Sequence, residues 1–114
     1  MSGEFLYLTT TGRTTGLPRQ IEIWFVEMGG KFYILAEHYH RTQWVKNIQR
    51  DPRVRVRIGR GQSPEFDATA RALDPERDAE LWQATQRLSR EKHGWGNGLP
   101  VEITPASPPP AEAP

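Results

Sequence analysis

Strand patterns that follow one another without an intervening helix are the feature that most restricts the fold of this chain. Residues 4–10 and 19–28 are rich in aromatic and β-branched side chains, which are typical of strands. Gly29-Gly30 then forms a two-residue hairpin signal before a third apolar run at residues 31–36. The first third of the sequence therefore predicts an antiparallel β-meander.

Helix signals occur at two places further along. Thr42 is a helix-capping residue before an apolar stripe, and Asp74-Pro75 begins a second helical pattern that ends at Gly94. Apolar and arginine residues alternate over residues 53–58, which is typical of a half-buried strand. The expected elements are a short helix at 42–50, strands at 53–58 and 66–73 around a turn at 59–65, a longer helix at 74–94 and a last strand at 99–104.

Six strands with one short and one longer helix predict a mainly β fold of the α+β class. Because the strands mostly follow one another instead of alternating with helices, a small barrel is favoured over a doubly wound sheet. The length of 114 residues corresponds to a single domain. We expect this domain to span residues 1–104 and a disordered Pro/Ala-rich tail to occupy residues 105–114.

Composition narrows the classes of partner. The chain has 15 basic and 14 acidic side chains, so its net charge of +1 gives no argument for nucleic acid or membrane binding. It has no cysteine, which excludes disulfides and thiolate sites and is typical of cytoplasmic proteins. No apolar run is long enough for an integral membrane segment or a signal peptide. Residues 1–60 carry ten basic against five acidic side chains, so this half is the one expected to attract an anion.

The segment Thr9 to Arg19, TTTGRTTGLPR, joins the first two predicted strands. Its glycines and threonines expose backbone N–H groups and hydroxyls, and its two arginines add charged donors, as a phosphate or carboxylate site requires. The alternative is a hairpin whose threonines satisfy their own backbone. No phosphate-loop or dinucleotide fingerprint is present to decide between the two.

Three other patterns have a functional and a structural interpretation. The arginines at 53, 55 and 57 share one strand face, which fits a solvated surface, a second anion anchor or a surface for single-stranded nucleic acid. His38 and His40 have the spacing of a metal pair but lack a third ligand, so polar residues at a strand end are the simpler interpretation. Trp44 and Asn47 lie on one helix face, either as core and cap or as a surface for an aromatic ring.

Two motifs together resemble a known family. Thr-Gly-Arg-x-x-Gly-x-Pro-Arg at residues 11–19 and Trp-x-x-Asn-Ile-x-x-x-Pro-x-Val at residues 44–54 are similar to the deazaflavin-dependent nitroreductases. The similarity covers about residues 5–104. This family belongs to the flavin/deazaflavin oxidoreductase superfamily, so the resemblance implies a six-stranded antiparallel split β-barrel of the FMN-binding type, related to pyridoxamine-phosphate oxidases.

The resemblance also implies a function and a site. Reduced deazaflavin coenzyme F-420 would lie in a groove of the barrel and pass a hydride to a nitro compound, a quinone or an activated C=C bond, leaving binding and orientation to the protein. It implies a small-molecule substrate and pairing into a homodimer. The coenzyme-binding residues carried over by motif are Thr11, Gly12, Arg13, Thr14, Thr15, Gly16, Pro18, Arg19, Ala36, Glu37, Gln43, Trp44 and Asn47, and those expected on the substrate side are Tyr39, His93 and Trp95.

Alternatives to a deazaflavin reductase remain open from the sequence. They are an FMN-dependent reductase, a non-catalytic binder of a flavin-like or other anionic small molecule, and a nucleic-acid-binding barrel that uses the arginines at 53, 55 and 57. The family often has lysine after the Gly-Arg pair, where this chain has Thr14, so the loop carries one positive charge fewer. Glu37 adds a negative charge near the predicted ring site.

Overall fold

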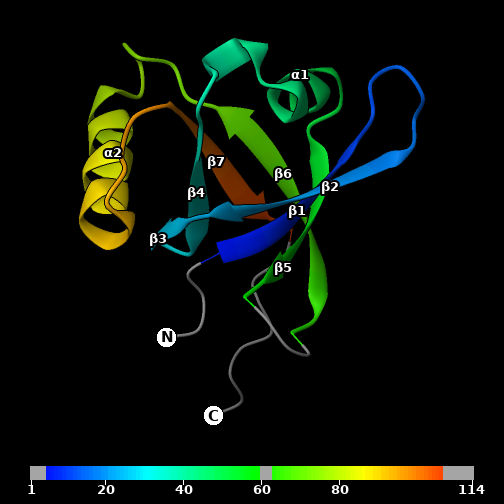
Figure 1. Cartoon of the computed structure of the whole chain (residues 1–114), viewed down its shortest axis with the longest axis horizontal. Helices are drawn as coiled ribbons and strands as arrows, with labels where there is room; N and C mark the ends of the chain where they lie inside the picture. Colours follow the sequence, from blue (N-terminus) through cyan, green and yellow to red (C-terminus); the bar gives the residue numbers. More distant parts are fainter. Residues whose placement is uncertain (1–4, 60–62, 107–114) are drawn as a thin grey trace.

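Seven antiparallel strands form one curved sheet in the part of the chain that the structure describes, with two α-helices at its margins (Figure 1). This computed structural model describes residues 5–59 and 63–106. The described elements are, in chain order, β1 Phe5–Thr11, β2 Pro18–Trp24, β3 Val26–Met28, β4 Lys31–Ala36, the 3-10 helix η1 Tyr39–Arg41, α1 Gln43–Arg50, β5 Arg53–Ile58, β6 Glu65–Ala72, α2 Ala79–His93 and β7 Leu99–Pro105.

The strand order is β2-β1-β5-β6-β7-β4-β3, so β2 and β3 are the two edges of the sheet. In the sequence these edges are separated by Phe25 alone. The sheet therefore curls until its two edges meet at Phe25, which gives a barrel whose edge strands β2 and β3 are joined by the chain and not by a ladder of hydrogen bonds. This confirms the mainly β barrel with helices.

The prediction of six strands was wrong, because residues 19–28 form two strands instead of one. Phe25 and Val26 are both buried although they are neighbours, so the alternation of buried and exposed side chains shifts by one residue at this point. Before the shift the chain pairs with β1, and after it the chain pairs with β4. The local break in alternation redirects the chain from one edge to the other.

The core fills the inside of the curved sheet. Leu6, Leu8 and Val56 are fully buried at alternate positions of β1 and β5, and Val45 and Ile48 of α1 close the same cluster. As predicted, the arginines of β5 lie on the opposite face from Val54 and Val56. Figure 1 shows α1 over one end of the barrel and α2 along its side, next to β3, β4 and β7.

The longer helix begins later than the predicted residue 75. Asp74 caps a separate turn, in which its Oδ1 accepts hydrogen bonds from the backbone N–H of Glu76 (2.8 Å) and of Arg77 (2.9 Å). The helix α2 starts only at Ala79 and ends at the left-handed Gly94 (φ 79°). Strand β7 extends to Pro105, and residues 107–114 of the predicted tail, like residues 60–62 of the predicted turn, lie outside the described residues.

Candidate functional site

The loop between β1 and β2 is a tight turn closed by its own backbone. Gly12 N–H donates to Leu17 O (2.8 Å), and Gly16 N–H donates to Gly12 O (2.8 Å). Gly16 has φ +75°, a conformation that side chains rarely adopt. Thr15 Oγ1 accepts from Leu17 N–H (3.2 Å), so one threonine does serve its own backbone. The other polar groups of the exposed loop face outward or toward α1.

Arg13 ties this loop to helix α1. Its Nη1 donates to Asn47 Oδ1 (2.9 Å) and its Nη2 to Gln43 Oε1 (2.7 Å), while its backbone N–H also donates to Asn47 Oδ1 (3.2 Å). Asn47 is 5% exposed, and its Nδ2 donates to the buried Thr10 Oγ1 (3.0 Å). Asn47 is therefore neither a cap nor a solvated residue: it joins the helix, β1 and the loop.

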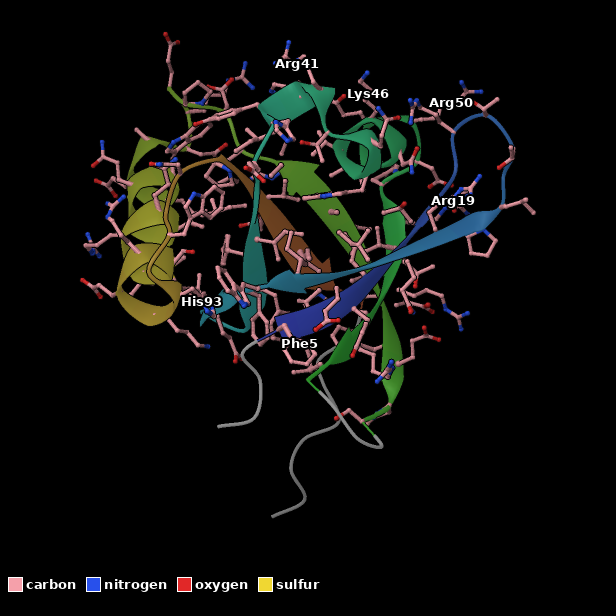
Figure 2. The ribbon with its side chains drawn as sticks, viewed as in Figure 1. Phe5, Arg19, Arg41, Lys46, Arg50 and His93 are labelled. Carbon is pink, nitrogen blue, oxygen red and sulfur yellow. The ribbon has the colours of Figure 1, made fainter. Side chains whose placement is uncertain are left out.

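A cavity of about 360 Å³ lies between this loop and α1, and we call it the loop cavity. No carboxylate occurs among its described lining residues. The side chain of Arg19 makes no hydrogen bond or ion pair with another described residue, so its guanidinium is free to meet a ligand. Figure 2 shows Arg41, Lys46 and Arg50 around α1 at the same end of the molecule as Arg19. The loop cavity is lined by Gly12, Arg13, Thr14, Thr15, Arg19, Ile21, Gln43, Trp44 and Asn47.

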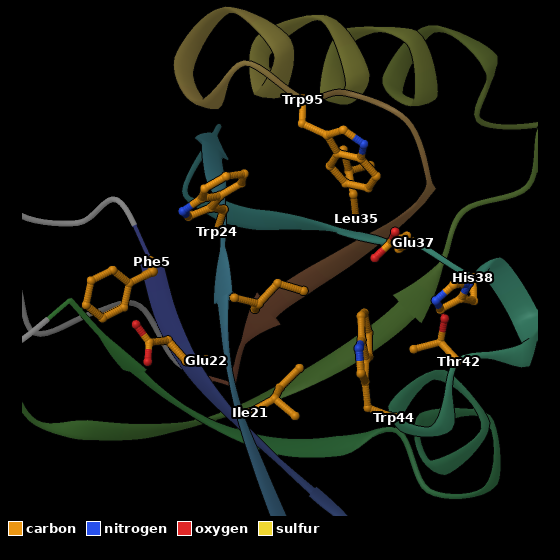
Figure 3. A pocket seen from close by; sticks show the side chains of 11 residues that line it. Phe5, Ile21, Glu22, Trp24, Leu35, Glu37, His38, Thr42, Trp44 and Trp95 are labelled. Carbon is orange, nitrogen blue, oxygen red and sulfur yellow. The ribbon is translucent and has the colours of Figure 1, made fainter.

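A second, larger cavity of about 790 Å³ lies where the barrel is open between β2 and the end of β4, and we call it the edge cavity (Figure 3). It shares Ile21 and Trp44 with the loop cavity, so the two are adjacent. Its walls are mainly aromatic and aliphatic, with polar groups from the segment that joins β4 to α1. The lining residues are Phe5, Ile21, Glu22, Ile23, Trp24, Leu35, Glu37, His38, Thr42, Trp44 and Trp95.

Thr42 brings an unsatisfied polar atom to the edge cavity. Within the described ranges, its Oγ1 is the buried side-chain oxygen that has no hydrogen-bond partner. Thr42 also precedes α1 without capping it through its side chain, contrary to the predicted capping role. A buried hydroxyl without a partner is unfavourable, but this oxygen is sealed from solvent, so a ligand in the cavity reaches it only if the side chain rotates.

Helix α2 holds the wall of the edge cavity that carries Trp95. Ser89 Oγ donates to Trp95 O (2.6 Å), and Gln86 Nε2 donates to Gly98 O (2.8 Å). Gly98 has φ +126°, and a Cβ there would lie 2.9 Å from Ala36 O, so a glycine is needed at this crossing. These contacts fix the Trp95 segment against the end of β4.

The structure brings most of the predicted coenzyme residues together and separates others. Eight of them line the loop cavity, and one of these, Trp44, also lines the edge cavity together with Glu37. Ala36 is buried beside them without lining either. A different groove, on the outer face of the sheet, is lined by the remaining residues Thr11, Gly16 and Pro18 together with Arg53 and Arg55.

The three residues predicted on the substrate side have different surroundings. Trp95 lines the edge cavity. His93 stacks on Trp24 with ring centroids 4.9 Å apart, and its Nε2 donates to Phe25 O (2.9 Å). Tyr39 is 42% exposed, has φ 53° and lines neither cavity.

The arginines of β5 are engaged by the protein itself. Arg53 pairs with Asp51 (2.9 Å) and thereby lowers the pKa of that carboxyl, and Arg55 lies 3.6 Å from both Glu65 and Asp67. Arg57 lies over the ring of Tyr7, 4.2 Å from its centroid. This face is therefore largely neutralised, which removes the charge that a nucleic-acid site would need.

A buried polar network lies outside both cavities, on the face that α2 covers. Glu102 is 6% exposed and accepts from Tyr33 OH (2.9 Å) and Arg71 Nη2 (3.1 Å). Arg71 also donates to Asp78 (3.0 Å), which lowers the pKa of Asp78, and burial together with Glu102 raises the pKa of Tyr33. The network links the start of α2 to β4, β6 and β7.

Sequence reasoning missed much of the edge cavity. The sequence identified Ile21, Ile23 and Leu35 simply as strand residues, and it gave His38 as a metal ligand or, more simply, a polar residue at a strand end. His40 instead accepts from Gln49 Nε2 (3.0 Å), and no metal-binding group of three or more His, Cys, Asp or Glu occurs among the described residues. Trp24 gave one usable signal, because a tryptophan at an expected exposed position, here 49% exposed, often marks a binding surface.

Comparisons with known proteins agree with this geometry. The family model described as F420H(2)-dependent quinone reductase matches residues 1–104. The chain is 27% identical to a solved F420-H2 dependent reductase (FDR-A), with a TM-score of 0.62 over 88% of this chain and 92% of that one. It is 20% identical to the heme storage protein HutZ from Vibrio cholerae, with a TM-score of 0.72 over 91% and 82%, a likeness of fold alone.

A further solved structure, described as a domain-swapped dimer, is 26% identical to this chain, with a TM-score of 0.60 over 90% of this chain and 81% of that one. The described helices include none that is long and apolar enough to cross a membrane.

Proposed function

This chain belongs to the F420H(2)-dependent quinone reductase family, and from that premise we propose that it holds reduced coenzyme F-420 across the two adjacent cavities and reduces a small electron-poor acceptor. The main support for the proposal is that the cationic loop cavity lies directly beside the aromatic edge cavity. The two cavities share Ile21 and Trp44. A coenzyme with a planar ring and an anionic tail needs these two surfaces side by side.

The anionic tail fits the loop cavity. Arg19 supplies a free guanidinium there, and the exposed hydroxyls of Thr14 and Thr15 add donors without adding negative charge. Gly12 lets the two sides of the loop lie close together, since a Cβ at this position would lie 3.1 Å from both Leu17 O and Thr15 Oγ1. Arg13 contributes its positive charge, but most of its donors already hold Gln43 and Asn47.

The ring fits the edge cavity, where Trp44 stands at the junction with the loop cavity. When bound, reduced F-420 supplies a hydride. The protein's part is to hold ring and acceptor in contact and to exclude water, and the walls formed by Ile21, Leu35 and Trp95 are suited to this task. The nitro compound, the quinone and the activated C=C bond remain the acceptors we propose.

A titration of the purified protein with F-420, FMN and FAD, followed by quenching of its tryptophan fluorescence, tests this proposal. Three of the four tryptophans line the edge cavity, so a ring bound there should quench strongly. We expect F-420 to bind at least about tenfold more tightly than FMN, because its longer acidic tail reaches the loop cavity. Anaerobic stopped-flow mixing of the reduced complex with menadione should then reoxidise the coenzyme.

Two outcomes would contradict the proposal. Tighter binding of FMN than of F-420 would favour the FMN-dependent alternative. Tight binding of F-420 without reoxidation by any of menadione, a nitroimidazole or a cyclohexenone would favour the non-catalytic binder.

A further inference from the structure

The two cavities carry opposite charge. Among its described residues the loop cavity has two arginines and no carboxylate, whereas the edge cavity has Glu22 and Glu37 and neither lysine nor arginine. Neither glutamate makes an ion pair or side-chain hydrogen bond with another described residue. A ligand in the edge cavity therefore meets uncompensated negative charge, which a positive group would stabilise and an anion would oppose.

The aromatic walls of the edge cavity also attract positive charge. Trp24, Trp44 and Trp95 all line the edge cavity, and the faces of tryptophan rings attract cations more strongly than those of other aromatic side chains. Figure 3 shows Trp44 and Trp95 on opposite sides of the space into which Glu37 projects from the end of β4. Tryptophan faces beside a carboxylate form a site that suits a flat, positively charged ring.

Glu37 also lies at the polar end of the cavity. His38 and Thr42 follow it in the connection to α1, and Thr42 Oγ1 is the hydroxyl that lacks a partner. A ligand with a hydrogen-bond donor or a cationic nitrogen at one end would meet the carboxylate of Glu37 there. Ile23, Leu35 and Trp95 add apolar wall to the same cavity.

We propose that the edge cavity selects a planar aromatic acceptor that carries a positive charge, with Glu37 as the main specificity-determining residue. This inference rests on the proposed function and names the substrate class of that site. Reduced F-420 would supply the hydride, so that a C–H bond of its ring would break and a ring proton would pass to solvent, while a C–H bond would form on the acceptor and a monocationic acceptor ring would become neutral. The product then loses its attraction to Glu37, so reduction itself favours release.

Isothermal titration calorimetry with a size-matched series of ligands tests the charge preference apart from turnover. The probes are 2-naphthylmethyl-trimethylammonium, 2-naphthalenemethanol and 2-naphthalenesulfonate, each titrated into wild-type protein with and without saturating oxidised F-420. We expect the cation to bind at least about tenfold more tightly than the sulfonate. Two unit charges 6 Å apart in water already change an affinity by about threefold, and the cavity holds two carboxylates.

Matched variants assign the effect to a residue. Glu37→Gln should reduce the ratio of cation to anion affinity by about three- to tenfold. Glu27→Gln, which removes an exposed carboxylate of β3 that lines neither cavity, should leave the ratio unchanged. Equal affinity for cation and anion, absence of cation binding, or an unchanged ratio in Glu37→Gln would overturn the inference.

The same measurements separate the two proposals. If F-420 fails to bind while the cation preference persists in the protein alone, the proposed function fails and the charge selectivity stands. If F-420 binds and is reoxidised equally well by cationic and anionic acceptors, the proposed function stands and the charge selectivity fails.

Discussion

At the scale of single residues, the two loop arginines have different surroundings and therefore different expected roles. Arg13 already donates to Gln43 and Asn47, whereas Arg19 makes no such contact with a described residue. The sequence treats them alike, since both belong to the same motif. We therefore propose Arg13 as a positioning residue for the loop and Arg19 as the donor to the coenzyme's tail.

Substituting each arginine should separate these roles. Arg19→Ala should weaken F-420 binding by about 1.5–3 kcal/mol and leave the free energy of unfolding within about 0.5 kcal/mol. Arg13→Ala should also lower the free energy of unfolding by about 1–2 kcal/mol, because the buried Asn47 Oδ1 loses its guanidinium donor and keeps only the backbone N–H of residue 13. Fluorescence titration and urea unfolding measure the two effects, with Arg87→Ala of α2 as control. Equal loss of stability in both variants would contradict the assignment.

Thr14 gives a second test at this scale. It is exposed in the loop cavity, directly after Arg13. Thr14→Lys should tighten F-420 binding by about three- to tenfold at low salt, because it adds a positive charge beside the tail. Thr14→Gln controls for length. If the lysine and glutamine variants bind F-420 equally, or if the gain does not fall as ionic strength rises, charge is not the cause.

Much of the loop cavity could be predicted from residue types, and little of the edge cavity could. A short motif concentrates Gly12, Arg13 and Arg19 in the sequence, and their chemistry favours an anion site as one of two interpretations. The edge cavity is assembled from β2, β4, the connection to α1 and the segment after α2, each with ordinary apolar residues. Only the curvature of the sheet brings these together, and no local pattern encodes it.

At the scale of elements, helix α2 is held at its start by charge and along its length by packing. Asp78 Oδ2 accepts from Arg71 Nη1 (3.0 Å) and from Asp74 N–H (2.8 Å), and Arg71 continues to Glu102 in β7. The pKa of Asp78 is lowered, first by Arg71 and then by the backbone of Asp74. Since α2 carries Gln86 and Ser89, this anchor also supports the Trp95 wall of the edge cavity.

The anchor should depend on pH in a defined direction. Because the folded pKa of Asp78 lies below the unfolded value, its contribution is complete above about pH 5 and is lost as the pH falls through the folded pKa. Asp78→Asn should lower the free energy of unfolding by about 1–2 kcal/mol at pH 7, and by less at pH 3. Urea unfolding from pH 7 to pH 3 measures the difference. A loss for Asp78→Asn that stays constant with pH would contradict this account.

The elements show where periodicity succeeds and fails as a predictor. The short helix, the strand with alternating arginines and the last strand lie where their patterns predict them. The break at Phe25 was missed because two consecutive short strands give the same residue pattern as one longer strand. The only sign of the break is that the neighbours Phe25 and Val26 are both buried. The start of α2 was misplaced because Asp74 caps a turn as effectively as it caps a helix.

At the scale of the whole molecule, Phe25 is the residue through which the two sheet edges meet. Its ring packs against Phe32 with centroids 5.5 Å apart, Lys92 lies over it, and its carbonyl accepts from His93. It is 4% exposed. Packing at this one position therefore joins β2, β3, β4 and α2.

Truncating this side chain should weaken the whole barrel. Phe25→Ala should lower the free energy of unfolding by about 3–5 kcal/mol, because it leaves a cavity at the joint of the two edges. Phe5→Ala, at the partly exposed start of β1, serves as control and should cost less. Chemical denaturation measures both. If both variants lose a similar free energy of unfolding, packing at Phe25 contributes no more to stability than packing at Phe5.

The strand order also sets the sequence of events when the chain folds. Strand β7 lies between β6 and β4, although it comes more than sixty residues after β4, as in the pairing of Tyr33 with Glu102. The hairpin of β1 and β2 and that of β5 and β6 can form early, but β4 has only the three-residue β3 beside it until residues 99–105 arrive. Assembly of the barrel during synthesis on the ribosome must therefore wait for the last strand, and the pairing of distant segments makes slow folding the expectation.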